Sequence, residues 1–503
     1  MVSSTHGKDL RRLALSVLQP GFVGTDAPDW MLRDIGDGLA SVVLFARNIV
    51  SIDQVARLTG RLRAENPELV IAIDEEAGDV TRIESATGST RPGNFALGTV
   101  DDTDLTEAVA ADLGRQLRAA GISLDYAPSA DVNSNPDNPI IGVRSFGVDP
   151  KVVSRHTGAW IRGLQSAGVA ACAKHFPGHG DVAVDSHHGL PTYGADREQI
   201  AAQALPPFRA ALEAGVRAVM TGHLLVPAYD TELPATLSRR ILDGLLRQEL
   251  GFDGMVVTDA IEMGAVADRY GLGGATVRAV AAGADAVCVG GENAEEATVG
   301  LLADALVDAV AAGDLTEARL AEASGRVREF AAWSAGLSPV GPADTNGSRI
   351  GFAAARRAIR LTGAVQETVP LSAAPHVVEL VPTTNLAIGK ETPWGVAAPL
   401  VERLPGTTSV RVRDEDLRSR TATLETHALT PAAGRPLVVV VRDASRHGWM
   451  ARALAEIVTA RPDAIVVEMG LPGAPVPAAA QIFTHGATAA SGVAAAEVLA
   501  GVR

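Results

Sequence analysis

One segment of the chain gathers residue types that are scarce elsewhere in it. Residues 174–191 read KHFPGHGDVAVDSHHGLP and hold Lys174, four of the 11 histidines and two aspartates. Glycines and prolines interrupt this segment, so it cannot form a regular helix and we expect a long structured loop. Its ammonium, imidazole and carboxylate groups could bind a metal ion or transfer protons. A plain polar surface loop is the third interpretation, but four histidines in one loop argue against it.

The spacing within this loop favours proton transfer over metal binding. His175 and His179 are four residues apart, but the Pro-Gly pair between them removes the helix that would align them as ligands. Asp185 and His187 are two residues apart, so both side chains can lie on one side of an extended loop. A carboxylate beside an imidazole holds one tautomer and raises the basicity of the other nitrogen. We therefore expect a general acid–base dyad of His187 and Asp185, and no metal ion.

A carboxylate stands at the end of an apolar run in residues 254–263, GMVVTDAIEM. Asp259 follows this run directly, and an ionised group is costly there unless it has a partner or a function. Capping the next helix is one such function for an aspartate. With an acid–base dyad on another loop, a nucleophilic carboxylate is the interpretation we favour.

Two further segments carry groups that bind hydroxyl-rich ligands. Asp74, Glu75 and Glu76 precede Arg82, and Arg144 lies in the stretch NPIIGVRSFG at 138–147. Carboxylates accept hydrogen bonds from hydroxyl groups, and guanidinium groups donate them in a forked geometry. Salt bridges that tie these loops down are the alternative.

The strands that must carry these groups alternate with helical segments over the first two thirds of the chain. Continuous apolar runs predict strands buried on both faces, and their alternation with helices predicts parallel pairing. Eight such units in about 330 residues favour an α/β fold with an N-terminal TIM-type (β/α)8 barrel over a doubly wound sheet. In both folds the functional groups follow the strand ends, as Asp74, Lys174 and Asp259 do here. Asp131 and His223 also stand just past expected strands, where a functional role is favoured over helix capping. The expected strands are 13–18, 42–45, 69–73, 122–126, 169–173, 218–220, 255–257 and 284–289, and the expected helices include 54–63, 106–120, 153–167 and 201–214.

A stretch rich in glycine and proline, residues 336–348, predicts a linker. It separates the barrel, 1–335, from a smaller C-terminal α/β sandwich domain, 349–503. Polar pairs such as Arg442-Asp443 and Thr484-His485 follow strands of this second domain, where we expect an interdomain contact or plain surface rather than a vestigial site. The expected strands are 377–381, 409–412, 437–441, 464–467 and 481–483, with a helix at 450–459.

Composition excludes several classes of protein. The chain has 503 residues, of which 47% are apolar and 20% charged, so a disordered chain is excluded. Its net charge of −15 argues against a nucleic-acid-binding surface, and no apolar run is long enough to cross a membrane. Cys172 and Cys288 lie in apolar runs and are expected to be buried thiols. Arg11-Arg12 before an apolar stretch faintly suggests an export signal, but no cleavage site follows, so we expect a cytoplasmic protein.

Taken in chain order, the motifs resemble those of family 3 glycoside hydrolases, and most closely the β-N-acetylglucosaminidase (β-hexosaminidase) branch. The resemblance covers the whole expected barrel, and the small C-terminal domain is similar to that of two-domain members. KHFPGHG followed by Asp-Ser-His is its most specific part. The motifs are IDEEAGDVTRI at 73–83, NPIIGVRSFG at 138–147, KHFPGHG at 174–180, DSHHGLP at 185–191, PATLS at 234–238 and VVTDAIEM at 256–263.

The resemblance implies a role for each matching residue. Asp259 matches the catalytic nucleophile, and His187 with Asp185 matches the His/Asp acid–base of this branch. The sugar subsite departs from the pattern at two positions, because Ala77 stands where a glycine is usual and Asp79 where an arginine is usual. The positions that bind the non-reducing sugar match Asp74, Arg82, Arg144, Lys174 and His175.

The implied activity is that of a retaining, exo-acting β-N-acetylglucosaminidase that removes terminal GlcNAc from muropeptides derived from peptidoglycan. Asp259 would form a covalent glycosyl-enzyme, and His187 would protonate the departing oxygen and then deprotonate water. The implied partner is a small carbohydrate, and no cofactor is required. The resemblance does not decide between a monomer and a dimer. A phosphorylase is the main alternative, because a histidine acid–base does not repel phosphate. A metal-dependent barrel hydrolase and a non-catalytic sugar-binding protein are less favoured.

Overall fold

The chain divides into two units, neither of which is continuous in sequence. Unit 1 comprises Met1–Glu76, Thr103–Ile141 and Ser145–Thr345, and unit 2 comprises Ala77–Asp102, Gly142–Arg144 and Asn346–Arg503. The sequence suggested two contiguous domains instead, because short segments that leave one unit for another carry no compositional signal. The computed structural model describes residues 2–185, 189–337, 347–383, 387–389, 392–419 and 423–502, with side chains from residue 7 onward.

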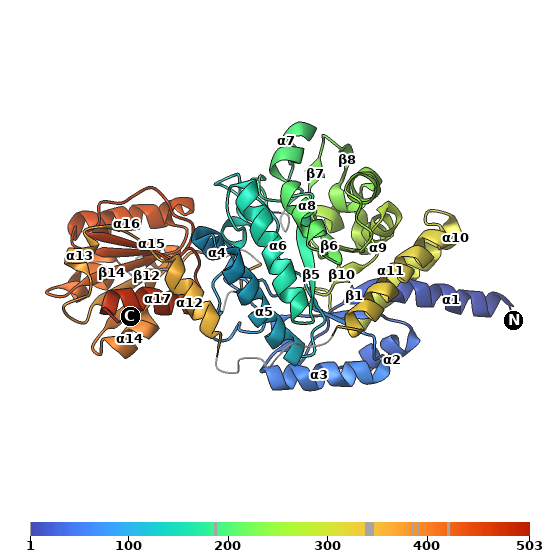
Figure 1. Cartoon of the computed structure of the whole chain (residues 1–503), viewed down its shortest axis with the longest axis horizontal. Coiled ribbons are helices and arrows are strands. Elements are labelled where there is room, and N and C mark those ends of the chain that lie inside the picture. Colours follow the sequence, from blue (N-terminus) through green and yellow to red (C-terminus); the bar gives the residue numbers. More distant parts are fainter. Residues whose placement is uncertain are drawn as a thin grey trace. The chain divides into compact units, whose positions relative to one another are not determined.

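Unit 1 contains parallel barrel strands at the expected places, except that the first one begins only at Leu18 (Figure 1). Six of them pair in the order β2-β3-β4-β5-β6-β9, and β10 pairs with β1. A bridge between Val257 and Ala286 connects β9 to the segment before β10, and the Ser41 hydroxyl donates to the Leu18 carbonyl between β2 and β1. The predicted α/β barrel fold is therefore confirmed. The strands are β1 (Leu18–Pro20), β2 (Ser41–Leu44), β3 (Val70–Ile73), β4 (Leu124–Asp125), β5 (Ala170–Phe176), β6 (Ala218–Thr221), β9 (Met255–Thr258) and β10 (Val287–Val289).

Alternate residues of these strands form one apolar core. Val70 and Ala72 of β3 and Met255 and Val257 of β9 belong to it, as the two-residue period of a strand requires. Both cysteines are free thiols in this core, as expected, and burial raises the pKa of each.

The helices of unit 1 follow the strands along the chain and surround them (Figure 1). Predicted strand 13–18 is wrong: it falls mostly on α1, because Leu10 and Ala14 recur at helical spacing on a buried face. Predicted helix 201–214 is two helices, because Pro206 begins the second one. The helices are α1 (Val2–Ser16), α2 (Asp29–Asp37), α3 (Ile52–Glu65), α5 (Thr103–Ala119), α6 (Pro150–Ser166), α7 (Arg197–Gln203), α8 (Pro206–Glu213), α9 (Gly264–Ala282), α10 (Glu296–Ala312) and α11 (Glu317–Ala335), with a hairpin of β7 (Leu225–Val226) and β8 (Asp230–Pro234) and a π-helix at Arg240–Glu249.

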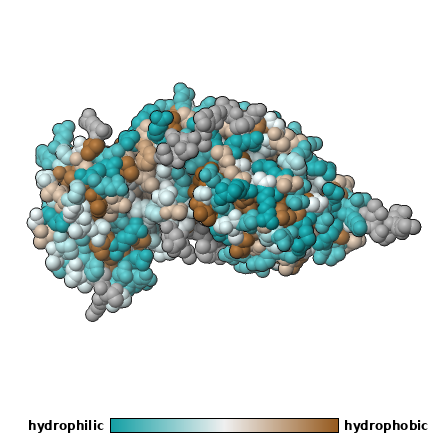
Figure 2. Space-filling view, turned by 90° about the horizontal axis from the view of Figure 1, so that it is seen from below, coloured by the Kyte–Doolittle hydropathy of each residue, from teal (hydrophilic) through white to brown (hydrophobic). Residues whose placement is uncertain are grey.

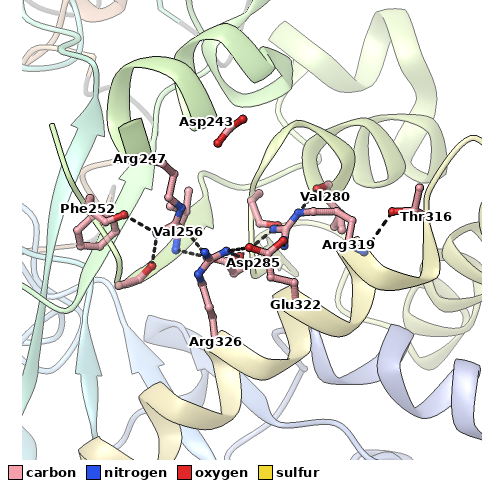
Figure 3. Close-up of polar contacts among 12 residues, drawn as sticks. Asp243, Arg247, Phe252, Val256, Val280, Asp285, Thr316, Arg319, Glu322 and Arg326 are labelled. Atoms are coloured by element: carbon pink, nitrogen blue, oxygen red, sulfur yellow. Dashed lines mark hydrogen bonds and ion pairs between the residues drawn. The ribbon is translucent and has the colours of Figure 1, made fainter. Parts of the chain in front are cut away.

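A buried group of ion pairs lies in unit 1 where β9 and β10 begin (Figure 3). Asp285 has no exposed surface, and its carboxylate contacts Arg247 at 2.5 Å, Arg319 at 2.8 Å and Arg326 at 3.4 Å. It also accepts a hydrogen bond from the Val256 amide at 2.9 Å. We call Asp285, the three arginines and Glu322, which pairs with Arg319 and Arg326, the Asp285 cluster.

Unit 2 is a three-layer α/β domain around a six-stranded sheet of order β11-β16-β15-β14-β12-β13. Val439 packs on the face covered by α16 and Val438 on the face covered by α14 and α17, so both faces are buried. The sheet is parallel except for edge strand β11, whose exposed sequence RLTG gave no strand signal. The strands are β11 (Arg360–Gly363), β12 (His376–Leu380), β13 (Thr408–Val412), β14 (Leu437–Val441), β15 (Ile465–Glu468) and β16 (Ala480–Phe483), and the helices are α4 (Asn94–Val100), α12 (Arg349–Ala358), α13 (Val365–Thr368), α14 (Ala397–Arg403), α15 (Asp414–Arg418), α16 (Gly448–Ala460) and α17 (Ala489–Ala500).

The surface is mostly polar on the face that Figure 2 shows, with apolar side chains scattered over it. Exposed large apolar residues are separated along the chain, as Val50, Val148 and Leu301 are. None of the helices in the described part of the chain combines the length and apolar character that a bilayer crossing requires.

Candidate active site

A buried lysine of β5 pairs with two carboxylates that follow β3 in unit 1, and β4 lies between these two strands. Lys174 lies in β5, and its side chain is 2% exposed. Its ammonium contacts the carboxylate of Asp74, directly after β3, and the Glu76 carboxylate at 2.6 Å. We call these three residues the Lys174 cluster. A buried ammonium requires such partners, because it is costly to bury a charge without an opposite one.

Asp131 organises the start of the histidine-rich loop. Its carboxylate accepts a hydrogen bond from His175 Nδ1 at 2.7 Å and from the His179 amide at 2.6 Å. Although burial alone would raise it, the pKa of Asp131 is lowered, mainly by His175 and then by His179. The ionised carboxylate keeps a proton on Nδ1 of His175, so that Nε2 is the nitrogen left to meet a ligand.

His179 is a neutral imidazole with unused hydrogen-bonding groups. Its side chain is buried, and neither ring nitrogen has a hydrogen-bond partner among the described residues. Burial and the neighbouring His175 lower its pKa to about 4, and the two rings lie edge to face with centroids 6.0 Å apart. A group that is neutral above about pH 4 cannot donate a proton near neutral pH. Among the described residues, no three His, Cys, Asp or Glu side chains form a group able to hold a metal ion.

Asp259 follows β9, which is separated from β5 by β6 alone. Its amide donates to the Thr221 carbonyl at 3.2 Å, and its carboxylate accepts from the Ala260 amide at 2.8 Å. Buried His223 fixes the next peptide, because its Nε2 lies 3.0 Å from the Ala260 carbonyl and its Nδ1 lies 2.8 Å from the Thr236 hydroxyl. The carbonyl can only accept, so Nε2 carries the proton. His223 and Thr236 thus position the turn that presents Asp259.

Asp125, at the end of β4, is a buried carboxyl group beside this site. One of its oxygens accepts from the Glu75 amide at 2.9 Å, and the other has no partner in the part of the chain that the structure describes. Burial raises the pKa of Asp125 well above its ordinary value, and the charge of Glu75 adds to this. A neutral Asp125 avoids a further negative charge next to the Lys174 cluster.

The structure brings together Asp74, Lys174, His175 and Asp259 at the carboxyl ends of one parallel sheet, as the sequence predicted. Asp185 lies on the loop that follows β5, the strand of His175. His187 lies outside the described residues, so the pairing of Asp185 with His187 stays a prediction.

The two predicted sugar-binding arginines belong to unit 2. Arg82 donates to the Ala387 carbonyl at 3.0 Å, and Arg144 is buried, with its own carbonyl accepting from Asn94 at 2.7 Å.

Four supporting residues of the site were not among the predicted site residues: Asp125, Asp131, His179 and His223. Asp131 and His223 each follow a predicted strand closely, and this signal marked both positions as functional without giving either a role. Asp125 falls inside a predicted strand and gave no such signal.

The family model "Glycosyl hydrolase family 3 N terminal domain" matches residues 31–330 of the chain. The chain belongs to glycosyl hydrolase family 3. This family 3 chain is 38% identical over 269 residues to beta-hexosaminidase A of Pseudoalteromonas piscicida, covering 49% of this chain and 45% of that protein. It is 38% identical over 283 residues to a beta-hexosaminidase of Stenotrophomonas maltophilia K279a, and the match covers 54% of this chain and 82% of that protein.

Solved family 3 structures resemble the chain more completely. The structure of a family 3 beta-N-acetylglucosaminidase from Paenibacillus sp. str. FPU-7 has a TM-score of 0.85 and 32% identity, and covers 98% of this chain and 96% of that chain. The match to Pseudoalteromonas beta-hexosaminidase A, by contrast, spans less than half of that protein's length.

Proposed function

We propose that the protein is a retaining, exo-acting β-N-acetylglucosaminidase. The observation that carries the proposal is the Lys174 cluster, which lies two strands away from Asp259 at the carboxyl ends of one parallel sheet. Relatives named beta-hexosaminidase at 38% identity and the likeness to the Paenibacillus enzyme support the GlcNAc specificity. GlcNAc-terminated muropeptides are the substrate we infer from the resemblance, and a cytoplasmic location stays a prediction.

In the proposed reaction the Lys174 cluster binds the hydroxyl groups of the terminal sugar. Asp74, 24% exposed, accepts hydrogen bonds from them, and Lys174 donates. Asp259 attacks the anomeric carbon while the bond to the departing oxygen breaks, which leaves the sugar on the carboxylate as an ester. His223 and Thr236 hold the Asp259 turn during this step.

The proton for the departing oxygen comes from His187, held by Asp185. After the aglycone leaves, neutral His187 takes a proton from the attacking water, and the water oxygen replaces the ester bond to Asp259. The lowered pKa of His179 supports this choice between the histidines, because His179 is neutral where the enzyme would work. Arg82 and Arg144 stay predicted sugar-binding residues.

The test compares turnover of p-nitrophenyl β-GlcNAc with that of the matched β-glucoside, in buffers with and without phosphate. We expect the GlcNAc glycoside to be cleaved in both buffers, with free GlcNAc as the product and the glucoside a poor substrate. Cleavage of the glucoside alone would contradict the specificity. GlcNAc-1-phosphate as the product would assign the phosphorylase alternative instead.

A further inference from the structure

The segment 77–102 begins one residue after Glu76 of the Lys174 cluster and belongs to unit 2. It is held there along its length. The Ser89 carbonyl accepts from the Ala490 amide at 3.1 Å, and Asp102 pairs with Arg357 at 2.8 Å. The turn that opens the segment is tight, since Ala77 and Gly78 both have left-handed backbone conformations, with φ of 57° and 63°.

One ion pair anchors this turn. The Asp79 carboxylate contacts Arg442 at 2.6 Å, and the two side chains are 2% and 4% exposed. Its other oxygen accepts from the Ala487 amide at 2.8 Å, just before α17. A buried pair of this kind costs much when one partner is removed, because the other charge is left unpaired.

Arg442 is itself held in place from several sides. Buried Glu468 accepts hydrogen bonds from the amides of Asp443, Ala444 and Gly470, at 2.8, 3.2 and 2.7 Å, and so fixes the loop after β14. The Arg442 guanidinium also lies over the Trp394 ring, 5.7 Å from its centroid. Such a fixed cation selects an anion as its partner, which accounts for the acidic residue at position 79.

We propose that Asp79 and Arg442 are positioning residues through which unit 2 sets the sugar affinity of the proposed active site. Three peptide bonds join Glu76 to Asp79, so an anchored Asp79 restricts the backbone that carries Glu76 and hence the geometry around Lys174. The role rests on the proposed function. Through this role unit 2 contributes to catalysis by positioning Glu76, although it supplies no reacting group.

The experiment measures kcat and KM for p-nitrophenyl β-GlcNAc together with amide hydrogen exchange of residues 70–102. The variants are Asp79→Asn, Arg442→Met, the double variant and Arg442→Lys. The matched control is Glu379→Gln, because Glu379 is also buried in unit 2 and pairs with one arginine, Arg411, at 2.8 Å. It accepts hydrogen bonds from two backbone amides, Val396 at 3.1 Å and Ala397 at 3.2 Å.

We expect Asp79→Asn and Arg442→Met each to raise KM about tenfold, the equivalent of one hydrogen bond to a charged group, with kcat little changed. Exchange should rise in residues 77–80 and in the peptide that holds Glu76. The double variant should raise KM less than the product of the single effects, because it leaves no unpaired charge. Arg442→Lys should restore much of the affinity, and Glu379→Gln should alter neither KM nor exchange in residues 70–80.

Equal changes in Asp79→Asn and Glu379→Gln, or increased exchange with unchanged KM, would overturn the proposal, because the pair would then be only structural. A wild-type protein that cleaves no GlcNAc glycoside would contradict the proposed function instead. In that case amide exchange at Glu76 still tests whether Asp79 restricts this backbone. If exchange does not increase in Asp79→Asn, the proposed positioning role is wrong.

Discussion

Unit 1 buries charge at both ends of its strands, and the two sites are built differently. In the Asp285 cluster, where β9 and β10 begin, one carboxylate receives three guanidinium groups and a backbone amide. In the Lys174 cluster, at the carboxyl ends, one ammonium faces two carboxylates. Close to the Lys174 cluster, one carboxyl oxygen of Asp125 and both ring nitrogens of His179 have no hydrogen-bond partner within the described ranges.

This difference separates a stabilising site from a reactive one. Hydrogen-bonding groups that are all satisfied within the protein hold elements together and offer nothing to a ligand. Buried polar groups without a partner lower stability, and they are retained where a substrate completes them. We therefore expect substitutions in the Asp285 cluster to change unfolding and substitutions at the carboxyl ends to change turnover.

The largest effect is expected for Asp259→Ala. Loss of the nucleophile should lower kcat on the order of 10³-fold or more, because the proposed ester forms on this carboxylate. Unfolding by urea should be unchanged, since Asp259 is only half-buried. A variant with lowered stability and retained turnover would show that Asp259 stabilises the fold and is not the nucleophile.

His187→Ala should separate substrates by leaving group. Without a general acid, glycosides of poor leaving groups should slow by about 10²–10⁴-fold, whereas p-nitrophenyl glycosides should slow far less. Asp185→Ala should show the same pattern more weakly, and azide should rescue the second step of the His187 variant. Equal slowing of both substrate classes without rescue would make His187 a binding residue.

Asp285→Asn tests the opposite end of the strands. Removing the charge leaves Arg247, Arg319 and Arg326 with one anion, Glu322, which contacts only two of them. The free energy of unfolding should fall by about 3–5 kcal/mol, measured in urea, while kcat and KM of the folded protein stay the same. A tenfold change in KM with normal stability would place a functional site there.

A pH titration extends the comparison to Glu468 of unit 2, a buried carboxylate whose hydrogen-bond donors are backbone amides. Burial, followed by the charge of Asp443, raises its pKa from 4.5 to about 7. The folded protein therefore takes up a proton between these values that the unfolded chain does not. The stability of wild type relative to Glu468→Gln should be highest below pH 4.5. It should fall by up to about 1.4 kcal/mol per pH unit as pH rises to 7. A pH-independent difference between the two proteins would contradict the raised pKa.

The smallest effect is expected for Ala77→Gly. Ala77 has a φ of 57°, where a Cβ atom is unfavourable and glycine is not. The variant should gain about 1 kcal/mol of unfolding free energy with unchanged kcat, measured by urea denaturation. A loss of stability would show that the alanine methyl group contributes packing that outweighs the strain.

The sequence predicted the elements and chemistry that are encoded locally. Lys174 and Asp259 stand beside apolar runs, so their placement at strand ends follows from period and burial alone. The Asp79–Arg442 pair joins residues 363 positions apart, and no local pattern relates them. For the same reason the transfer of segments 77–102 and 142–144 to unit 2 could not be predicted. Short apolar runs such as 13–18 fit a strand and a buried helix equally, so tertiary packing decides between them.

Trapping the covalent intermediate tests the central claim most directly. The protein is incubated with a slowly hydrolysed 2-fluoro or activated GlcNAc-type glycoside, digested, and analysed by mass spectrometry. We predict a single sugar adduct on the peptide that contains Asp259, absent from Asp259→Ala and present in Asp285→Asn. An adduct on another residue would contradict the assignment of Asp259 as the nucleophile.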